Sequence, residues 1–182
     1  LGDTISPEPA PERGHLLASA VSEAASIWNR YAKRMKHRIF DQLTKDSQAP
    51  QVVQYVLRDI HRENLFFEGR AASGFFDFDS IRVDTPWVDL SRWMGSFGSG
   101  DLQTERWWET AVVRFINGHP TLQEVDVQRG ALFARRLHEA TSWISLANWL
   151  VWLCRENRAF SAPPDVLAGR IRRLNRLVSE CF

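Results

Sequence analysis

Three polar residues in the middle of the chain have the types and the spacing that phosphoryl transfer requires. Asp59 is followed five positions later by Asn64, and Asp77 comes thirteen positions after that asparagine. In this chemistry a carboxylate orients the attacking hydroxyl and accepts its proton, while an asparagine and a second aspartate hold magnesium on the nucleotide phosphates. Magnesium prefers oxygen ligands, and a hydroxyl nucleophile needs a carboxylate within hydrogen-bond reach. The pattern predicts Asp59 as the catalytic base and Asn64 and Asp77 as metal ligands.

A short β-hairpin is expected to connect these residues. Residues 65–67 and 73–78 are rich in aromatic side chains, and a turn through Gly69 joins them. Asp79 follows Asp77 by two positions, so on an extended strand both side chains point to the same side. Asp79 is therefore either a further metal ligand or substrate contact, or a structural cap.

Most of the remaining sequence has the periodicity of helices, so we expect a mainly α fold with a small β-hairpin (α+β), forming one compact lobe. Asp101 and Ser161 are N-cap candidates. The polar stretch 44–48 should lead out of the first helix towards Pro50, and residues 52–57 form either a helix end or a strand. The expected helices span residues 15–38, 87–97, 102–117, 124–138, 139–158 and 164–180.

Composition places the chain among ordinary globular proteins. Of its 182 residues, 44% are hydrophobic and 25% charged, and the formal net charge of +1 gives no overall attraction to nucleic acid or membrane surfaces. No apolar run reaches the roughly 18 residues that a membrane span needs. Cys154 and Cys181 are too isolated for a metal motif and are expected to be reduced thiols of a cytoplasmic protein. Because the chain begins at Leu1, we expect a truncated chain or an internal fragment.

The segments 59–67 and 74–79 resemble the catalytic and metal loops of aminoglycoside phosphotransferase-like kinases, a family that includes choline, fructosamine and homoserine kinases. The resemblance continues through residues 84–90. It implies a protein-kinase-like C-terminal lobe that transfers the γ-phosphoryl group of ATP, with Mg²⁺, to a hydroxyl of a small molecule. The domain organisation it implies is a linker at 1–13 and a catalytic lobe at 14–182, with the catalytic loop at 57–67, the metal loop at 74–80 and a helical subdomain at 87–182.

The resemblance also suggests roles for residues around the three central ones. Phe66 and Phe76 match positions whose apolar side chains lie beneath the adenine, and Asp89 matches an aspartate that supports the catalytic loop through hydrogen bonds. His61 is expected to support the same loop, with a direct substrate or phosphate contact as the alternative. Leu57 departs from the histidine that is common at its position, which weakens the expected support of the loop.

A second departure concerns the other half of a kinase. No glycine-rich loop and no lysine in a β-like run precede residue 50, so the N-terminal lobe is expected to come from elsewhere in the parent protein. A catalytically inactive kinase-like module that binds a ligand or partner is therefore an alternative function. A metal-dependent hydrolase is a weaker one, because it needs more histidine ligands than His61 provides.

The tryptophan-rich helices after the metal loop are the expected place for the acceptor. Aromatic side chains beside Asp101, Glu105 and Glu109 suit a cationic acceptor such as an amino sugar or a quaternary amine. Tryptophans at helical spacing are equally typical of a packed core. The sequence leaves the two interpretations open.

Overall fold

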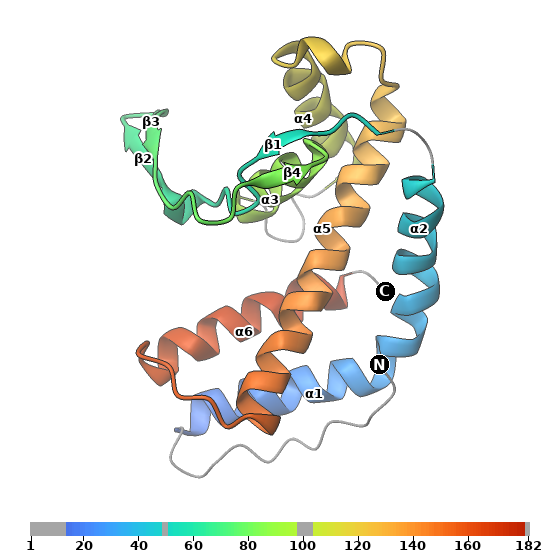
Figure 1. The fold of residues 1–182 in the computed structure, drawn as a ribbon. Helices are drawn as coiled ribbons and strands as arrows, with labels where there is room; N and C mark the ends of the chain where they lie inside the picture. Colours follow the sequence, from blue (N-terminus) through green and yellow to red (C-terminus); the bar gives the residue numbers. More distant parts are fainter. Residues whose placement is uncertain (1–13, 49–50, 98–103, 181–182) are drawn as a thin grey trace. The chain divides into compact units, whose positions relative to one another are not determined.

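The computed structural model describes residues 14–48, 51–97 and 104–180. The chain divides into two compact units (Figure 1). One, the terminal unit, combines Leu1–Gln42 with Glu139–Phe182, and the other, the central unit, is Leu43–His138. All of the predicted site residues belong to the central unit.

The terminal unit is mainly helical in the residues that the structure describes. Helix α1 (His15–Met35) buries an apolar stripe that includes Leu17 and Val21 and packs against α6 (Pro164–Ser179). The Asn175 side chain joins these helices by donating to the backbone carbonyl of Ala20 and to the Glu23 carboxylate, at 3.2 and 2.9 Å. Ser161 does not cap α6. That helix begins with Pro164 directly after Pro163, and proline suits a first helical turn because its missing N–H needs no partner there.

Two expected helix boundaries are wrong, for the same reason. Beyond Met35 the helical path continues through a π-helical turn, η2 (Lys36–Phe40), into α2 (Asp41–Ser47), so the polar stretch 44–48 is mostly helix. Similarly, the expected break between residues 138 and 139 is absent, because α5 (Val127–Leu150) runs through it and continues into the π-helical turn η6 (Val151–Arg155). Neither junction contains a glycine or proline, and polar residues alone do not end a helix.

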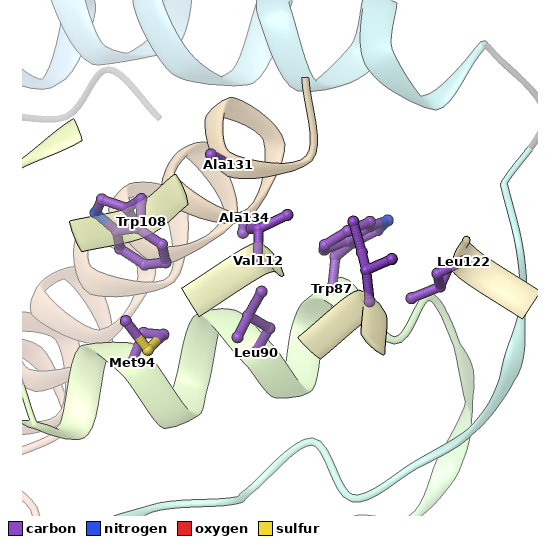
Figure 2. Packing of buried hydrophobic residues seen from close by; sticks show 9 residues of the cluster. Trp87, Leu90, Met94, Trp108, Val112, Leu122, Ala131 and Ala134 are labelled. Atoms are coloured by element: carbon purple, nitrogen blue, oxygen red, sulfur yellow. The ribbon is translucent and has the colours of Figure 1, made fainter. Parts of the chain in front are cut away.

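The core of the central unit lies between α3 (Trp87–Phe97), α4 (Glu105–Asn117) and the first part of α5. Thr104 caps α4 by accepting a hydrogen bond from the Trp107 N–H, whereas Asp101 lies outside the described residues. A short 3-10 helix, η5 (Pro120–Leu122), precedes α5. The core cluster, shown in Figure 2, consists of Trp87, Leu90, Met94, Trp108, Val112, Ile116, Leu122, Ala131 and Ala134.

Two antiparallel strand pairs accompany these helices. The predicted hairpin is present as β2 (Leu65–Glu68) and β3 (Ala71–Phe75), with Gly69 in the turn at a φ of 62°. Residues 52–57 contain the strand β1 (Gln54–Val56). It pairs with β4 (Arg82–Asp84), a strand that the sequence did not predict. The fold is thus mainly helical with small antiparallel sheets, as expected.

Candidate active site

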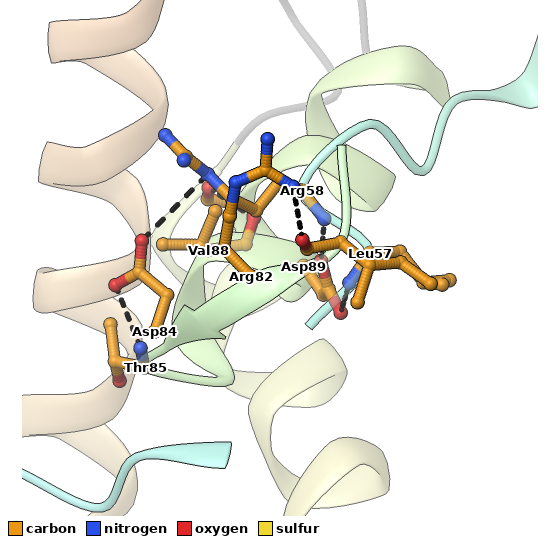
Figure 3. Close-up of polar contacts among 9 residues, drawn as sticks. Leu57, Arg58, Arg82, Asp84, Thr85, Val88 and Asp89 are labelled. Atoms are coloured by element: carbon orange, nitrogen blue, oxygen red, sulfur yellow. Dashed lines mark hydrogen bonds and ion pairs between the residues drawn. The ribbon is translucent and has the colours of Figure 1, made fainter. Parts of the chain in front are cut away.

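Helix α3 holds the segment that contains Asp59. The Asp89 carboxylate, in the first turn of the helix, accepts hydrogen bonds from the backbone N–H groups of Leu57 and Arg58, at 2.9 and 2.8 Å (Figure 3). Arg58 has a φ of 61°, a left-handed conformation that is costly for a residue with a Cβ. Two charge-assisted hydrogen bonds stabilise this unusual backbone directly before Asp59. The geometry is what a loop-supporting role for Asp89 requires, and it does not need a histidine at position 57.

The same helix contacts this segment a second time. The Ser96 hydroxyl oxygen, seven residues after Asp89, accepts a hydrogen bond of 3.2 Å from the Arg62 N–H. Arg62 begins a short 3-10 helix, η3 (Arg62–Asn64). We call residues 57–64 the Asp59 loop. Its two ends are therefore fixed to one face of α3, because residues seven apart lie on the same side of a helix.

Within the Asp59 loop, three of the predicted residues meet. The Asp59 Oδ1 atom lies 2.5 Å from the His61 Nε2 atom, and both side chains are about one-third exposed. The Asn64 Nδ2 atom donates to the backbone carbonyl of Asp59 at 3.0 Å. His61 thus contacts the proposed base itself, and the Asn64 amide ties the two ends of the motif together.

Asp77 is joined to the loop through the backbone. The Phe76 N–H donates to the carbonyl of Asn64 at 3.1 Å, so Asp77 directly follows a backbone contact with the other predicted metal ligand. Strand β3 has already ended at Phe75, and Asp77 has a φ of 69°. The extended-strand argument that placed Asp79 on the same side as Asp77 is therefore wrong. Asp79 lies at the start of a turn in which its backbone carbonyl accepts from Arg82, at 3.4 Å.

The two predicted adenine-facing residues share a face of the hairpin. Phe66 is opposite Gly74 in the β2–β3 register, and Phe76, which directly follows strand β3, contacts Phe66 through its ring. The Phe66 and Phe76 ring centroids are 5.2 Å apart, and the residues are 58% and 43% exposed. Phe75, on the opposite face, instead pairs with Phe78 at 4.9 Å.

The two predicted metal ligands, Asn64 and Asp77, have side-chain oxygen atoms, which suit magnesium. Among the described residues, no three histidine, cysteine, aspartate or glutamate side chains form a group that could hold a metal ion. The predicted pair, however, is one carboxylate and one carboxamide. Because the Asn64 nitrogen is engaged by Asp59, its oxygen is the atom that remains for a ligand, and oxygen is what magnesium prefers.

Sequence reasoning missed Arg92. This residue lies on α3 between Asp89 and Ser96, its Nε atom is buried, and that atom has no hydrogen-bond partner. Burial lowers the pKa of the Arg92 guanidinium below its ordinary value; the Asp59 carboxylate opposes this change and the Arg58 cation adds to it. The signal was present as spacing: Arg92 follows Asp89 by three residues and therefore shares its face.

The tryptophans expected to surround an acceptor divide between core and surface. Trp87, Trp108 and Trp143 are at most 4% exposed and belong to packed interiors. Trp93 and Trp107 instead line a cavity of about 740 Å³ between α3 and α4. Among the described residues, the charged side chains that line this cavity are Arg106 and Arg114; Glu105 and Glu109 do not line it, and Asp101 lies outside the described residues. The prediction of a cationic acceptor therefore gains no support from this cavity.

Comparison with known families agrees with the geometry. The model of the phosphotransferase enzyme family matches residues 4–103, more than half of the chain. The chain belongs to this family. Searches of curated proteins and of solved structures gave no significant match.

Membership in the phosphotransferase family confirms the resemblance found in the sequence and makes phosphoryl transfer the chemistry of the group as a whole. The matched region includes the Asp59 loop, both strand pairs and all of α3. In the part of the chain that the structure describes, no helix has the length and apolar character needed to cross a membrane.

Proposed function

We propose that this phosphotransferase transfers the γ-phosphoryl group of ATP to a hydroxyl of a small molecule, in the cytoplasm, with Asp59 as the catalytic base. The observation that carries the proposal is the convergence of Asp59, His61 and Asn64 in a loop whose backbone is fixed by Asp89. A carboxylate held in this way can orient an acceptor hydroxyl and take its proton. His61 and Asp89 act as supports of the loop.

Asn64 and Asp77 would bind Mg²⁺, with Asp79 as a further ligand or substrate contact. The backbone contact between Phe76 and Asn64 supports this pairing, because it keeps the two ligand-bearing segments together. The ion supplies charge neutralisation for the nucleotide phosphates. The aromatic face formed by Phe66 and Phe76 would lie beneath the adenine, which agrees with its exposure to solvent.

The partner that completes the nucleotide site would be an N-terminal lobe of the parent protein. Two observations support this proposal: the hairpin aromatics are exposed on both faces, and Tyr55 and Val83 on the other strand pair are 79% and 59% exposed. An added lobe would cover such surfaces. The acceptor is a small hydroxyl compound, and its being cationic stays a prediction.

The test is magnesium-dependent ATP turnover by the parent protein against a panel of amino sugars, amino alcohols and sugars, with the 182-residue chain assayed alongside. We expect turnover by the parent, little or none by the chain alone, and an acceptor class that emerges from the panel. Absence of turnover together with absence of magnesium-dependent nucleotide binding by the parent would contradict the proposal and favour an inactive, partner-binding module.

A further inference from the structure

Arg92 is the one charged side chain of α3 that faces the Asp59 loop without an assigned role. Asp89 and Ser96 fix the two ends of the loop through Leu57, Arg58 and Arg62. Arg92 follows Asp89 by three residues and precedes Ser96 by four, so it lies on the same face of the helix. Along the helix, Arg92 therefore lies between the two residues that hold the ends of the Asp59 loop.

The environment of Arg92 is unusual for an arginine. Its Nε–H is buried without a hydrogen-bond partner, and the group whose charge favours its cation is the carboxylate of Asp59. Arg92 is half-buried, and a guanidinium nitrogen that is taken from water is normally hydrogen-bonded, because its desolvation is costly. An arginine kept for stability would be expected to have such a partner. This one faces a proposed catalytic carboxylate instead.

The Asp59 carboxylate needs a second support. Its Oδ1 atom is paired with His61, which lies two residues away in the same loop. Nothing in that contact relates the carboxylate to the rigid helix. A cation on α3 does so, because α3 is packed into the core through Trp87, Leu90 and Met94.

We propose that Arg92 is a positioning residue for Asp59: its cation, placed on α3 between the two backbone anchors of the loop, holds the Asp59 carboxylate in place for the acceptor hydroxyl. The role rests on the proposed function, since it concerns the same base. It extends the action of α3 from the loop backbone to the reacting side chain.

A double-mutant cycle in the 182-residue chain tests the coupling without any activity. Asp59→Asn removes the charge that favours the buried guanidinium, so it should lower the thermal midpoint more in the wild-type background than in the R92M background, by about 2–4 °C. R92M alone should leave the midpoint unchanged or raise it, because an apolar side chain replaces a half-buried cation whose Nε–H has no hydrogen-bond partner. Arg114→Met, at an exposed arginine of α4, is the matched control and should be additive with Asp59→Asn.

Turnover by the parent protein gives the second readout. R92M should lower kcat by about 10–100-fold, the effect expected from a misplaced catalytic group, while the KM for ATP changes little. R92K, which keeps the cation, should recover part of kcat, and R92Q, which removes it, takes the place of R92M in the thermal cycle if R92M does not fold.

The two proposals fail in different ways. Additive midpoints in the cycle, or wild-type kcat in R92M, would overturn the role of Arg92 whatever the protein catalyses. Absence of turnover in the wild-type parent would instead remove the proposed function, while a coupled cycle would still show that Arg92 holds Asp59.

Discussion

The Asp59 loop and the aromatic hairpin are consecutive in the chain, yet they are held in different ways. The loop is anchored to α3 by the Asp89 carboxylate and the Ser96 hydroxyl, and α3 is packed into the core. The hairpin, β2–β3, pairs mainly with itself, and most of its residues are exposed. The comparison indicates that the groups proposed to act on the reacting atoms are fixed by the core, whereas the surface proposed for the nucleotide is not.

Loss of the Asp89 hydrogen bonds to the Asp59 loop should have the largest effect on stability and turnover. Asp89→Asn leaves one carbonyl oxygen where two carboxylate oxygens accepted hydrogen bonds, and its NH₂ group faces a backbone N–H. We expect the free energy of unfolding to fall by about 3 kcal/mol, since hydrogen bonds to charged groups are among the stronger ones. Turnover by the parent should fall at least in proportion to the fraction of molecules that remains folded. Chemical denaturation and ATP turnover measure the two effects.

The control for Asp89 is Asp126→Asn. Asp126 also accepts a backbone hydrogen bond, from the Arg129 N–H at 2.8 Å, but at the start of α5. Its replacement should cost about 1 kcal/mol, as for other helix caps, and leave turnover per folded molecule unchanged. Equal losses of turnover in both variants would show that the anchor at Asp89 has no special relation to the site.

A substitution in the hairpin should hardly change stability but should weaken nucleotide binding. Phe66→Ala removes an exposed ring, so the free energy of unfolding should change by less than about 0.5 kcal/mol. Nucleotide affinity of the parent should fall by about tenfold, because aromatic contacts of this kind contribute roughly 0.5–1.5 kcal/mol. Phe75→Ala, on the other face of the hairpin, is the matched control and should leave affinity unchanged. Calorimetric titration with a non-hydrolysable ATP analogue distinguishes the faces.

The smallest effect is expected at the second anchor. Ser96→Ala removes a single, half-buried acceptor for the Arg62 N–H, which should cost about 0.5–1 kcal/mol. Amide hydrogen exchange should show faster exchange at Arg62, with Leu57 and Arg58 unaffected. Faster exchange at all three amides would mean that the two anchors act as one unit, which would sharpen the view of how α3 holds the loop.

The motif itself could be predicted from the sequence because its chemistry depends on residue type and spacing. Asp59, Asn64 and Asp77 were selected in this way, and their roles stay predictions. The hairpin turn at Gly69 and the bounds of α3 were predicted and are present in the structure. These features are local, and each has a residue that marks it.

What the sequence did not reveal depends on pairing and backbone conformation. Strand β4 is only three residues long and forms because β1 lies opposite, which no local propensity shows. The left-handed conformation of Arg58 is stabilised by a hydrogen bond to Asp89, 31 residues further along the chain, and that of Asp77 made the strand-based placement of Asp79 fail. Arg92 was missed because its burial was not apparent until α3 was packed.

The most direct test of the account compares Asp59→Asn with Asp77→Asn in the parent protein, measuring ATP turnover and magnesium-dependent nucleotide binding in both. Asp59→Asn should abolish turnover and keep binding, because the base acts only on the acceptor hydroxyl. Asp77→Asn should lose magnesium-dependent binding as well, because a metal ligand is removed. Turnover that survives Asp59→Asn, or binding that survives Asp77→Asn unchanged, would contradict the assigned roles.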